Sequence, residues 1–115
     1  MILQAKLLLI ILDSDLVSNA FRYADITKEQ SFVKITTNLN EKNIIIIIED
    51  NGQGIDEKYL PRIFEMFYRA TETNTGSGLG LYILKETLTI LKGNIKVKSK
   101  YGVGTTFEVS IPNLI

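Results

Sequence analysis

Residues 44–54 read Ile-Ile-Ile-Ile-Ile-Glu-Asp-Asn-Gly-Gln-Gly, and their order sets the centre of the fold. Five consecutive isoleucines predict a β-strand that is buried on both faces and is therefore central in its sheet. The same run is the segment most prone to aggregation if it becomes exposed. Asp50 follows at the end of the strand, and Gly52 and Gly54 then favour a turn.

Strand patterns lie on both sides of this run. Residues 32–39 alternate and are rich in β-branched side chains, and the polar residues 40–43 favour a turn. An antiparallel hairpin with the isoleucine strand is therefore expected. Residues 95–100 and 105–111 alternate in the same way around Tyr101-Gly-Val-Gly104, which predicts a second hairpin.

Helical periodicity occupies much of the remaining chain. Apolar residues up to Tyr23 fall near one helical face, and residues 57–64 predict a short helix. Residues 81–91 form an amphipathic pattern that stops at Lys92-Gly93-Asn94. This order of elements predicts an α+β fold, a two-layer sandwich in which helices cover one face of a mixed, mostly antiparallel sheet. Residues 1–115 are long enough for one domain of this kind.

The composition excludes several classes of function. Thirteen basic and thirteen acidic residues cancel, so no basic surface argues for nucleic acid. The absence of histidine and cysteine excludes triad hydrolases that need histidine, metal sites built from imidazole or thiolate, and disulfides. Any metal is therefore expected to be a hard cation held by oxygen. The apolar residues 1–12 lack the cleavage site of a signal peptide and predict the buried start of the first helix.

A second glycine-rich segment precedes the last helix. Three glycines stand at alternate positions in Gly76-Ser-Gly78-Leu79-Gly80-Leu81, where a ligand can approach the backbone closely. The positive end of the following helix favours an anion such as phosphate, although these turns also serve as plain connectors. The polar residues 71–78 favour a lid or binding loop. Residues 64–68 can anchor that lid or belong to the core, and Arg69 can reach a phosphate or remain solvated.

Other polar side chains are candidates for the rest of a site. Asp15, Asn19 and Arg22 share one helical face, either as a ligand-binding group or as a solvated surface with one ion pair. The Asp50 carboxylate can accept hydrogen bonds from an amine such as that of adenine. Alternatively, Asp50 organises a tight turn, because Asp-Asn-Gly is a common turn sequence.

Five motifs resemble those of the ATP-binding catalytic domains of two-component sensor histidine kinases, in the family's order. Asn19 in Leu-Val-Ser-Asn-Ala-Phe-Arg-Tyr is similar to the N-box, Asp50-Asn-Gly-Gln-Gly54 to the first glycine box, and residues 63–69 to the F-box. Residues 76–80 are similar to the second glycine box and residues 102–107 to the motif of the closing hairpin. The resemblance implies the Bergerat fold, shared with gyrase, heat-shock chaperones and mismatch-repair ATPases.

The resemblance also implies a role for each candidate residue. Asn19 would hold Mg²⁺, and Asp50 would accept from the adenine amine, with Thr105 reaching the same edge through water. Tyr23 would pack on the base, and Arg22 takes the place of the family's usual phosphate-contacting lysine. The other residues expected to contact ATP are Gly52, Gly54, Ile55, Phe67, Arg69, Gly76, Gly78, Leu79, Gly80 and Leu81.

Asp15 departs from the family pattern, because most sensor kinases carry a second asparagine at this position. Asp15 is either a substituted magnesium ligand or a base that gives the domain ATP hydrolysis of its own. The ligand interpretation is favoured, since aspartate reaches less far than the glutamate of the related ATPases.

The expected function is a kinase catalytic domain that binds ATP with Mg²⁺ and transfers the γ-phosphoryl group to a histidine. Because the chain has no histidine, its acceptor is expected on the dimerisation domain of the same parent protein, with a response regulator downstream. The alternatives are a nucleotide-binding regulatory module and a self-contained ATPase of the same superfamily.

The family pattern also predicts a further strand before the first helix, so residues 1–115 are interpreted as an N-terminally truncated fragment. Such a fragment is expected to be inactive without its histidine domain, and its exposed sheet edge can pair two copies. The expected location is the cytoplasm. The chain is expected to be the cytoplasmic portion of a sensor kinase, and the full-length kinase can carry a membrane anchor.

Overall fold

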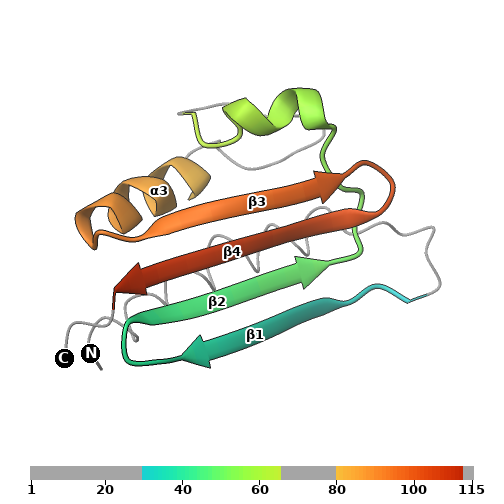
Figure 1. Ribbon diagram of the computed structural model, residues 1–115. Helices are drawn as coiled ribbons and strands as arrows, with labels where there is room; N and C mark the ends of the chain where they lie inside the picture. Colours follow the sequence, from blue (N-terminus) through green and yellow to red (C-terminus); the bar gives the residue numbers. More distant parts are fainter. Residues whose placement is uncertain (1–29, 66–79, 113–115) are drawn as a thin grey trace.

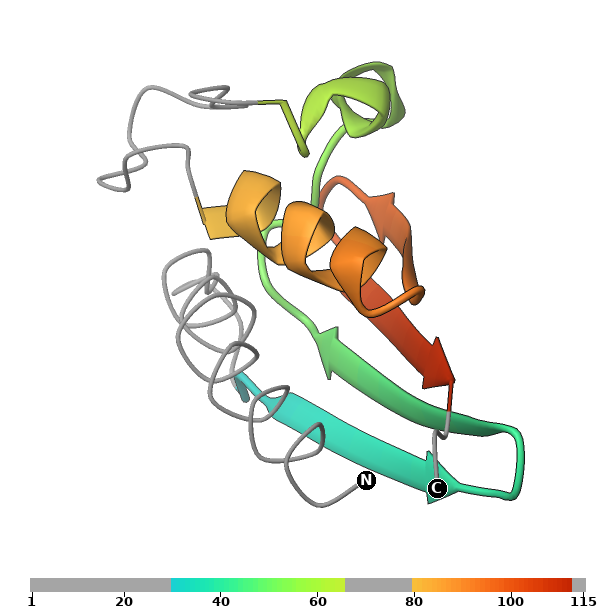
Figure 2. The same ribbon diagram turned by 90° about the vertical axis from the view of Figure 1, so that its left-hand side faces the viewer.

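The structure is a computed structural model that describes residues 30–65 and 80–112. The described residues form an antiparallel sheet with an α-helix on one of its faces (Figures 1 and 2). The elements in chain order are β1 Val33–Leu39, β2 Asn43–Asp50, the 3₁₀ helix η2 Glu57–Arg62, α3 Gly80–Ile90, β3 Asn94–Lys100 and β4 Gly104–Pro112. The predicted fold class is thereby confirmed.

The sheet has four described strands in the order β1-β2-β4-β3. Each described pair of neighbours is antiparallel, and both predicted hairpins, β1–β2 and β3–β4, are present. Strand β2 lies between β1 and β4, so the predicted central position of the isoleucine run is confirmed. The pairing of β2 with β4 sets Asp50 opposite Thr105, at one end of the sheet.

The two faces of β2 differ in burial, which corrects one prediction. Ile44, Ile46 and Ile48 are buried, whereas Ile45 and Ile47 are only half-buried. Successive side chains of a strand point to opposite faces, so the exposure alternates with the residue number. The prediction that this strand is buried on both faces is therefore wrong. Five identical isoleucines cannot show in the sequence which face is the more exposed.

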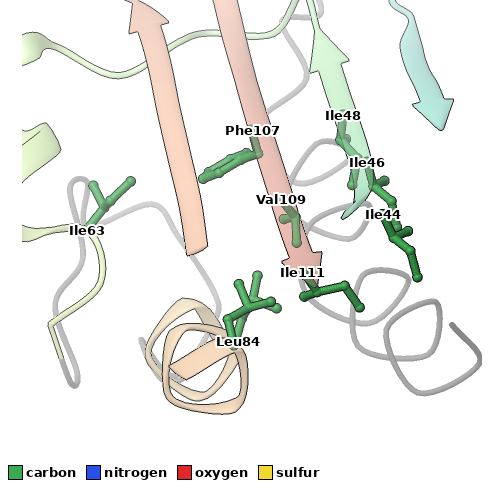
Figure 3. Packing of buried hydrophobic residues seen from close by; sticks show 9 residues of the cluster. Ile44, Ile46, Ile48, Ile63, Leu84, Phe107, Val109 and Ile111 are labelled. Atoms are coloured by element: carbon green, nitrogen blue, oxygen red, sulfur yellow. The ribbon is translucent and has the colours of Figure 1, made fainter. Parts of the chain in front are cut away.

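The hydrophobic core lies between the sheet and α3. Figure 3 shows Leu84 projecting from α3 toward the sheet, on the side from which the buried residues of β2 and β4 project. Each fully buried aliphatic side chain stabilises the fold by roughly 1.5–3 kcal/mol relative to its exposed form. The buried hydrophobic residues are Ile44, Ile46, Ile48, Ile63, Leu84, Leu88, Phe107, Val109 and Ile111.

Helix α3 ends at the segment that the sequence predicted, Lys92-Gly93-Asn94. The Gly93 N–H donates to Leu88 O at 2.7 Å and the Lys92 N–H to Thr89 O at 3.1 Å, which is a Schellman motif. Lys92 takes the left-handed conformation with φ 61°. A Cβ on Gly93 would lie 2.5 Å from Ser110 O, so the glycine serves close approach to β4 and the lysine adopts the unusual φ.

The two edge strands present different surfaces. On β3, three of the four exposed positions are lysines, Lys96, Lys98 and Lys100, which discourage pairing with another strand. On β1, six of the seven residues are exposed, and Ile35 and Leu39 are among them. Of the two edges, β1 is therefore the less protected. No helix in the described part of the chain is both long and apolar enough to cross a membrane.

Candidate functional site

Asp50 stands at the point where β2 enters the glycine-rich loop. Its Oδ1 accepts a hydrogen bond from the Gly52 N–H at 2.8 Å, and Gly52 is itself buried. The neighbouring Asn51 side chain ties this loop to the segment before β1, since its Oδ1 accepts from the Phe32 N–H at 2.8 Å and its Nδ2 donates to Gln30 O at 2.6 Å. The turn-organising role considered for Asp50 is therefore confirmed, and it holds the carboxylate in a fixed orientation.

The loop after Asp50 packs directly on the β3–β4 hairpin, backbone against backbone. Gly54 has φ 73°, and a Cβ there would lie 2.0 Å from Lys100 O. Gly104 has φ 148°, and a Cβ there would lie 2.1 Å from Asp50 O. The Gly102 N–H donates to Gln53 O at 2.6 Å. Glycine at positions 54 and 104 is thus required by contact as well as by conformation.

Thr105 lies opposite Asp50 in the register and is 7% exposed. Its Oγ1 is 2.7 Å from the Oγ of Ser99 on β3. The same Ser99 Oγ accepts from the Ile55 N–H at 2.7 Å and donates to Gly104 O at 3.0 Å. One serine therefore joins the loop after Asp50, the turn of the hairpin and the predicted site threonine.

Ser99 was not among the residues singled out from the sequence. A signal for it exists in the strand pattern, because Ile95, Val97 and Ser99 occupy the half-buried positions of β3 while lysines alternate with them. On that face of the strand, the two positions before Ser99 are apolar. A serine that is covered by other residues at such a position needs a hydrogen-bond partner.

The hydrophobic residues predicted near the site pack on the core. Ile55 and Leu81 are half-buried against the core cluster, and Gly80 is the first residue of α3. Phe64 also packs on this cluster, with the Lys85 ammonium 5.2 Å from the centre of its ring. For Phe64, the core interpretation is therefore the one that the structure supports.

The structure thus brings together five of the predicted site residues, Asp50, Gly52, Gly54, Ile55 and Thr105. Within residues 30–65 and 80–112, no group of three or more acidic side chains is placed to hold a metal ion. Two more, Gly80 and Leu81, are the first residues of α3. The remaining predicted site residues lie outside the described residues: Asp15, Asn19, Arg22, Tyr23, Phe67, Arg69, Gly76, Gly78 and Leu79.

The fold and this loop define a class of protein, the α+β domains with an antiparallel sheet that is covered by helix on one face. The model of the family "Histidine kinase-, DNA gyrase B-, and HSP90-like ATPase" matches residues 5–115. The chain belongs to this family. The resemblance seen in the five sequence motifs is therefore confirmed.

Sensor proteins are among the relatives of this chain. It is 39% identical over 103 residues to the sensor protein SrrB of Staphylococcus aureus, an alignment that covers 86% of this chain and 17% of SrrB. The chain thus spans about a sixth of the length of that curated relative. The mycobacterial sensor histidine kinase MprB has a similar structure, with a TM-score of 0.71 at 24% identity over 84% of this chain and 66% of the MprB chain. This likeness shows the fold.

Proposed function

We propose that the domain binds ATP with Mg²⁺ and transfers the γ-phosphoryl group to a histidine on a separate domain, as part of two-component signal transduction. The observation that carries the proposal is the fixed Asp50 carboxylate beside Thr105, at the end of the central strand. Membership of an ATPase family and similarity to sensor proteins support it further.

Recognition of the base rests on Asp50. A carboxylate accepts hydrogen bonds only, so it suits the exocyclic amine of adenine. The Gly52 N–H engages Oδ1 and holds the group in place before the nucleotide arrives, which reduces the entropy lost on binding. Thr105 reaches the same edge of the base through water, while Tyr23 and Phe67 pack on the nucleotide.

The phosphates and Mg²⁺ are assigned to residues that precede β1 in the chain and to residues between η2 and α3. Asn19 and Asp15 supply oxygen ligands of the kind that Mg²⁺ prefers, and the cation neutralises phosphate charge when bound. Arg22 and Arg69 contact phosphate oxygens. The segment from Gly76 to Leu81 closes over the triphosphate, because glycines at 76, 78 and 80 permit both close approach and movement.

The acceptor histidine belongs to the dimerisation domain of the same parent protein, because this chain contains no histidine. Residues 1–115 act as one catalytic domain that positions ATP for this acceptor, and a response regulator receives the phosphoryl group afterwards. The domain works in the cytoplasm, where ATP is available. Two copies can associate through β1, the less protected edge of the sheet.

A second candidate, ATP hydrolysis by the domain alone, is favoured by the acidic residue at position 15. ATP hydrolysis by the parent chain and by Asp15→Asn distinguishes the two functions. Equal rates would remove the hydrolytic base, whereas hydrolysis by the parent chain that Asp15→Asn loses would support an ATPase.

The proposed function is tested first by nucleotide binding. Asp50→Asn keeps an oxygen that can accept from the Gly52 N–H but replaces one acceptor by a donor, so affinity for a fluorescent ATP analogue should fall about 10- to 100-fold. Asp56→Asn is the matched control, because Asp56 is an exposed aspartate that caps η2 through the Lys58 N–H. Equal affinity of Asp50→Asn and the parent chain would contradict the assignment of adenine.

Phosphotransfer is tested by adding the histidine-bearing domain of the same parent protein to the chain with radiolabelled ATP. The expected product is an acid-labile phosphohistidine on the added domain. Tight ATP binding without any such product would favour the nucleotide-binding regulatory module instead.

A further inference from the structure

The hydroxyl of Ser99 lies within hydrogen-bond distance of three polar groups. The direction of each bond depends on which atom donates the proton. The Ile55 N–H lies 2.7 Å from Ser99 Oγ and can only donate to it. The Gly104 carbonyl oxygen lies 3.0 Å away and can only accept from it. The third neighbour is Thr105 Oγ1 at 2.7 Å, a hydroxyl that can act in either sense.

The two backbone groups decide which way the hydroxyl pair points. A serine hydroxyl has one proton and two acceptor lone pairs. The proton of Ser99 is directed to Gly104 O, and one lone pair receives the Ile55 N–H. The remaining lone pair faces Thr105. The contact between the two hydroxyls fits either direction by itself, and the use of the Ser99 proton by Gly104 O makes Thr105 the donor. Toward a ligand, the Thr105 oxygen is then left as an acceptor.

This direction matters because of what stands opposite Thr105. The register places Asp50 across from it on β2, and a carboxylate is an acceptor only. Two acceptors side by side favour a base edge, with its bound water, that supplies donors. At position 6, a 6-amino purine presents two N–H groups, whereas a 6-oxo purine presents an acceptor and carries its N–H at N1. The oxygen at position 6 would then face the oxygens of Asp50 and Thr105.

We propose that Ser99 is a positioning residue that sets the specificity of this site for 6-amino over 6-oxo purines, by holding Thr105 as an acceptor beside Asp50. The inference rests on the proposed function, in which Asp50 and Thr105 receive the base. Ser99 acts through Thr105 and the Ile55 N–H, and it needs no contact with the nucleotide itself.

The test measures two affinities, for fluorescent analogues of ATP and of inosine triphosphate, on the full chain with Mg²⁺. In Ser99→Ala, Thr105 loses its acceptor and is free to turn its proton toward the ligand. The ratio of the two affinities should therefore fall about fivefold, mainly because ATP binds more weakly. Ser99→Thr keeps the hydroxyl on a strand that accommodates a β-branched residue, and it should restore the ratio.

Two further variants keep the result interpretable. Ser99→Cys is close in size to serine but is a poor donor and acceptor, so it should lose the preference as alanine does. Ser110→Ala on β4 removes a serine that pairs with Ile45 and Asn94, away from the loop, and should leave both affinities unchanged. The unfolding midpoint of each variant reports whether the fold has been altered.

The possible outcomes separate this inference from the function on which it rests. If the parent chain binds neither nucleotide, the proposed function fails. The second case is a parent chain that prefers ATP. If Ser99→Ala and Ser99→Cys then keep that preference, or lower the affinity for both nucleotides equally, Ser99 is only structural and the inference is overturned. A selective loss that Ser99→Thr reverses supports it.

Discussion

The two hairpins of the sheet close in different ways. The β1–β2 turn makes hydrogen bonds among its own residues. The Asn40 side chain accepts from the N–H groups of Lys42 at 2.9 Å and Asn43 at 2.8 Å, and the Asn40 N–H donates to Asn43 O. The β3–β4 turn has an internal bond from the Val103 N–H to Lys100 O at 3.0 Å, and it also binds another segment, since the Gly102 N–H donates to Gln53 O. The first turn is a connector, and the second forms one wall of the candidate site.

The difference shows how a turn can be specified by what it touches. Tyr101 and Val103 expose their side chains to solvent, while the glycines between and after them bring the backbone against the loop that follows Asp50. Turn sequences are usually explained by local conformation alone. In this hairpin, a contact between segments far apart in the chain adds a second requirement.

The largest contrast is expected between β4, which contributes to the core, and the exposed strand β1. Phe107 on β4 is 5% exposed, and Phe107→Ala should lower the free energy of unfolding by about 4 kcal/mol through lost burial and the cavity left behind. Leu39 at the end of β1 is 60% exposed, and Leu39→Ala should cost less than about 0.5 kcal/mol. Urea denaturation of both variants measures the difference. Similar losses would show that β1 and β4 contribute alike to the core.

A smaller effect is expected from Gly104→Ala. The added Cβ would meet Asp50 O, so β4 and the end of β2 must separate, at a cost of about 3 kcal/mol in the free energy of unfolding. Because Asp50 moves with its carbonyl, the affinity for ATP should fall as well. Both quantities are measured on the same protein, by urea denaturation and by titration with the fluorescent analogue.

Gly102→Ala is the matched control for this variant. Gly102 also has a positive φ, 84°, but a Cβ there meets nothing within 4 Å. Only the conformational cost of about 1 kcal/mol remains, and ATP affinity should be unchanged. If the two alanine variants behaved alike, the close approach at Gly104 would have no energetic role.

The smallest effect is expected in the β1–β2 turn. Asn40→Ala removes the side-chain acceptor for two backbone N–H groups, and water replaces it only in part, so stability should fall by about 1 kcal/mol. Nucleotide affinity should not change, because this turn lies at the other end of β2 from Asp50. Lys42→Ala keeps the backbone bonds and serves as the control. A loss of ATP affinity in Asn40→Ala would contradict the division between the two turns.

Local patterns in the sequence predicted much of the architecture. The isoleucine run predicted the centre of the sheet, alternation and turn residues predicted both hairpins, and Lys92-Gly93-Asn94 predicted the end of α3. These features depend on neighbours along the chain. Burial on a single face of β2 was not predicted, because it depends on the side of the sheet that α3 covers.

The unpredicted parts of the candidate site depend on long-range register. Ser99 and Ile55 are 44 residues apart, and their hydrogen bond exists only because β3 lies next to the loop after Asp50. Lys92 takes the left-handed position at the end of α3 because the neighbouring glycine is needed for contact with β4. Periodicity cannot show such contacts, although a serine at an inward position of β3 was a visible sign.

The bond between the Gly102 N–H and Gln53 O also has a consequence for amide hydrogen exchange. The amides of Gly52, Ile55 and Gly102 are all held in the joint between the loop and the hairpin, by Asp50, Ser99 and Gln53 respectively. Separation of the two segments breaks two of these bonds together, and native proteins exchange such amides in cooperative units. Deuterium uptake at Ile55 and Gly102 therefore reports the opening of this joint, and it can be measured without nucleotide and without catalytic turnover.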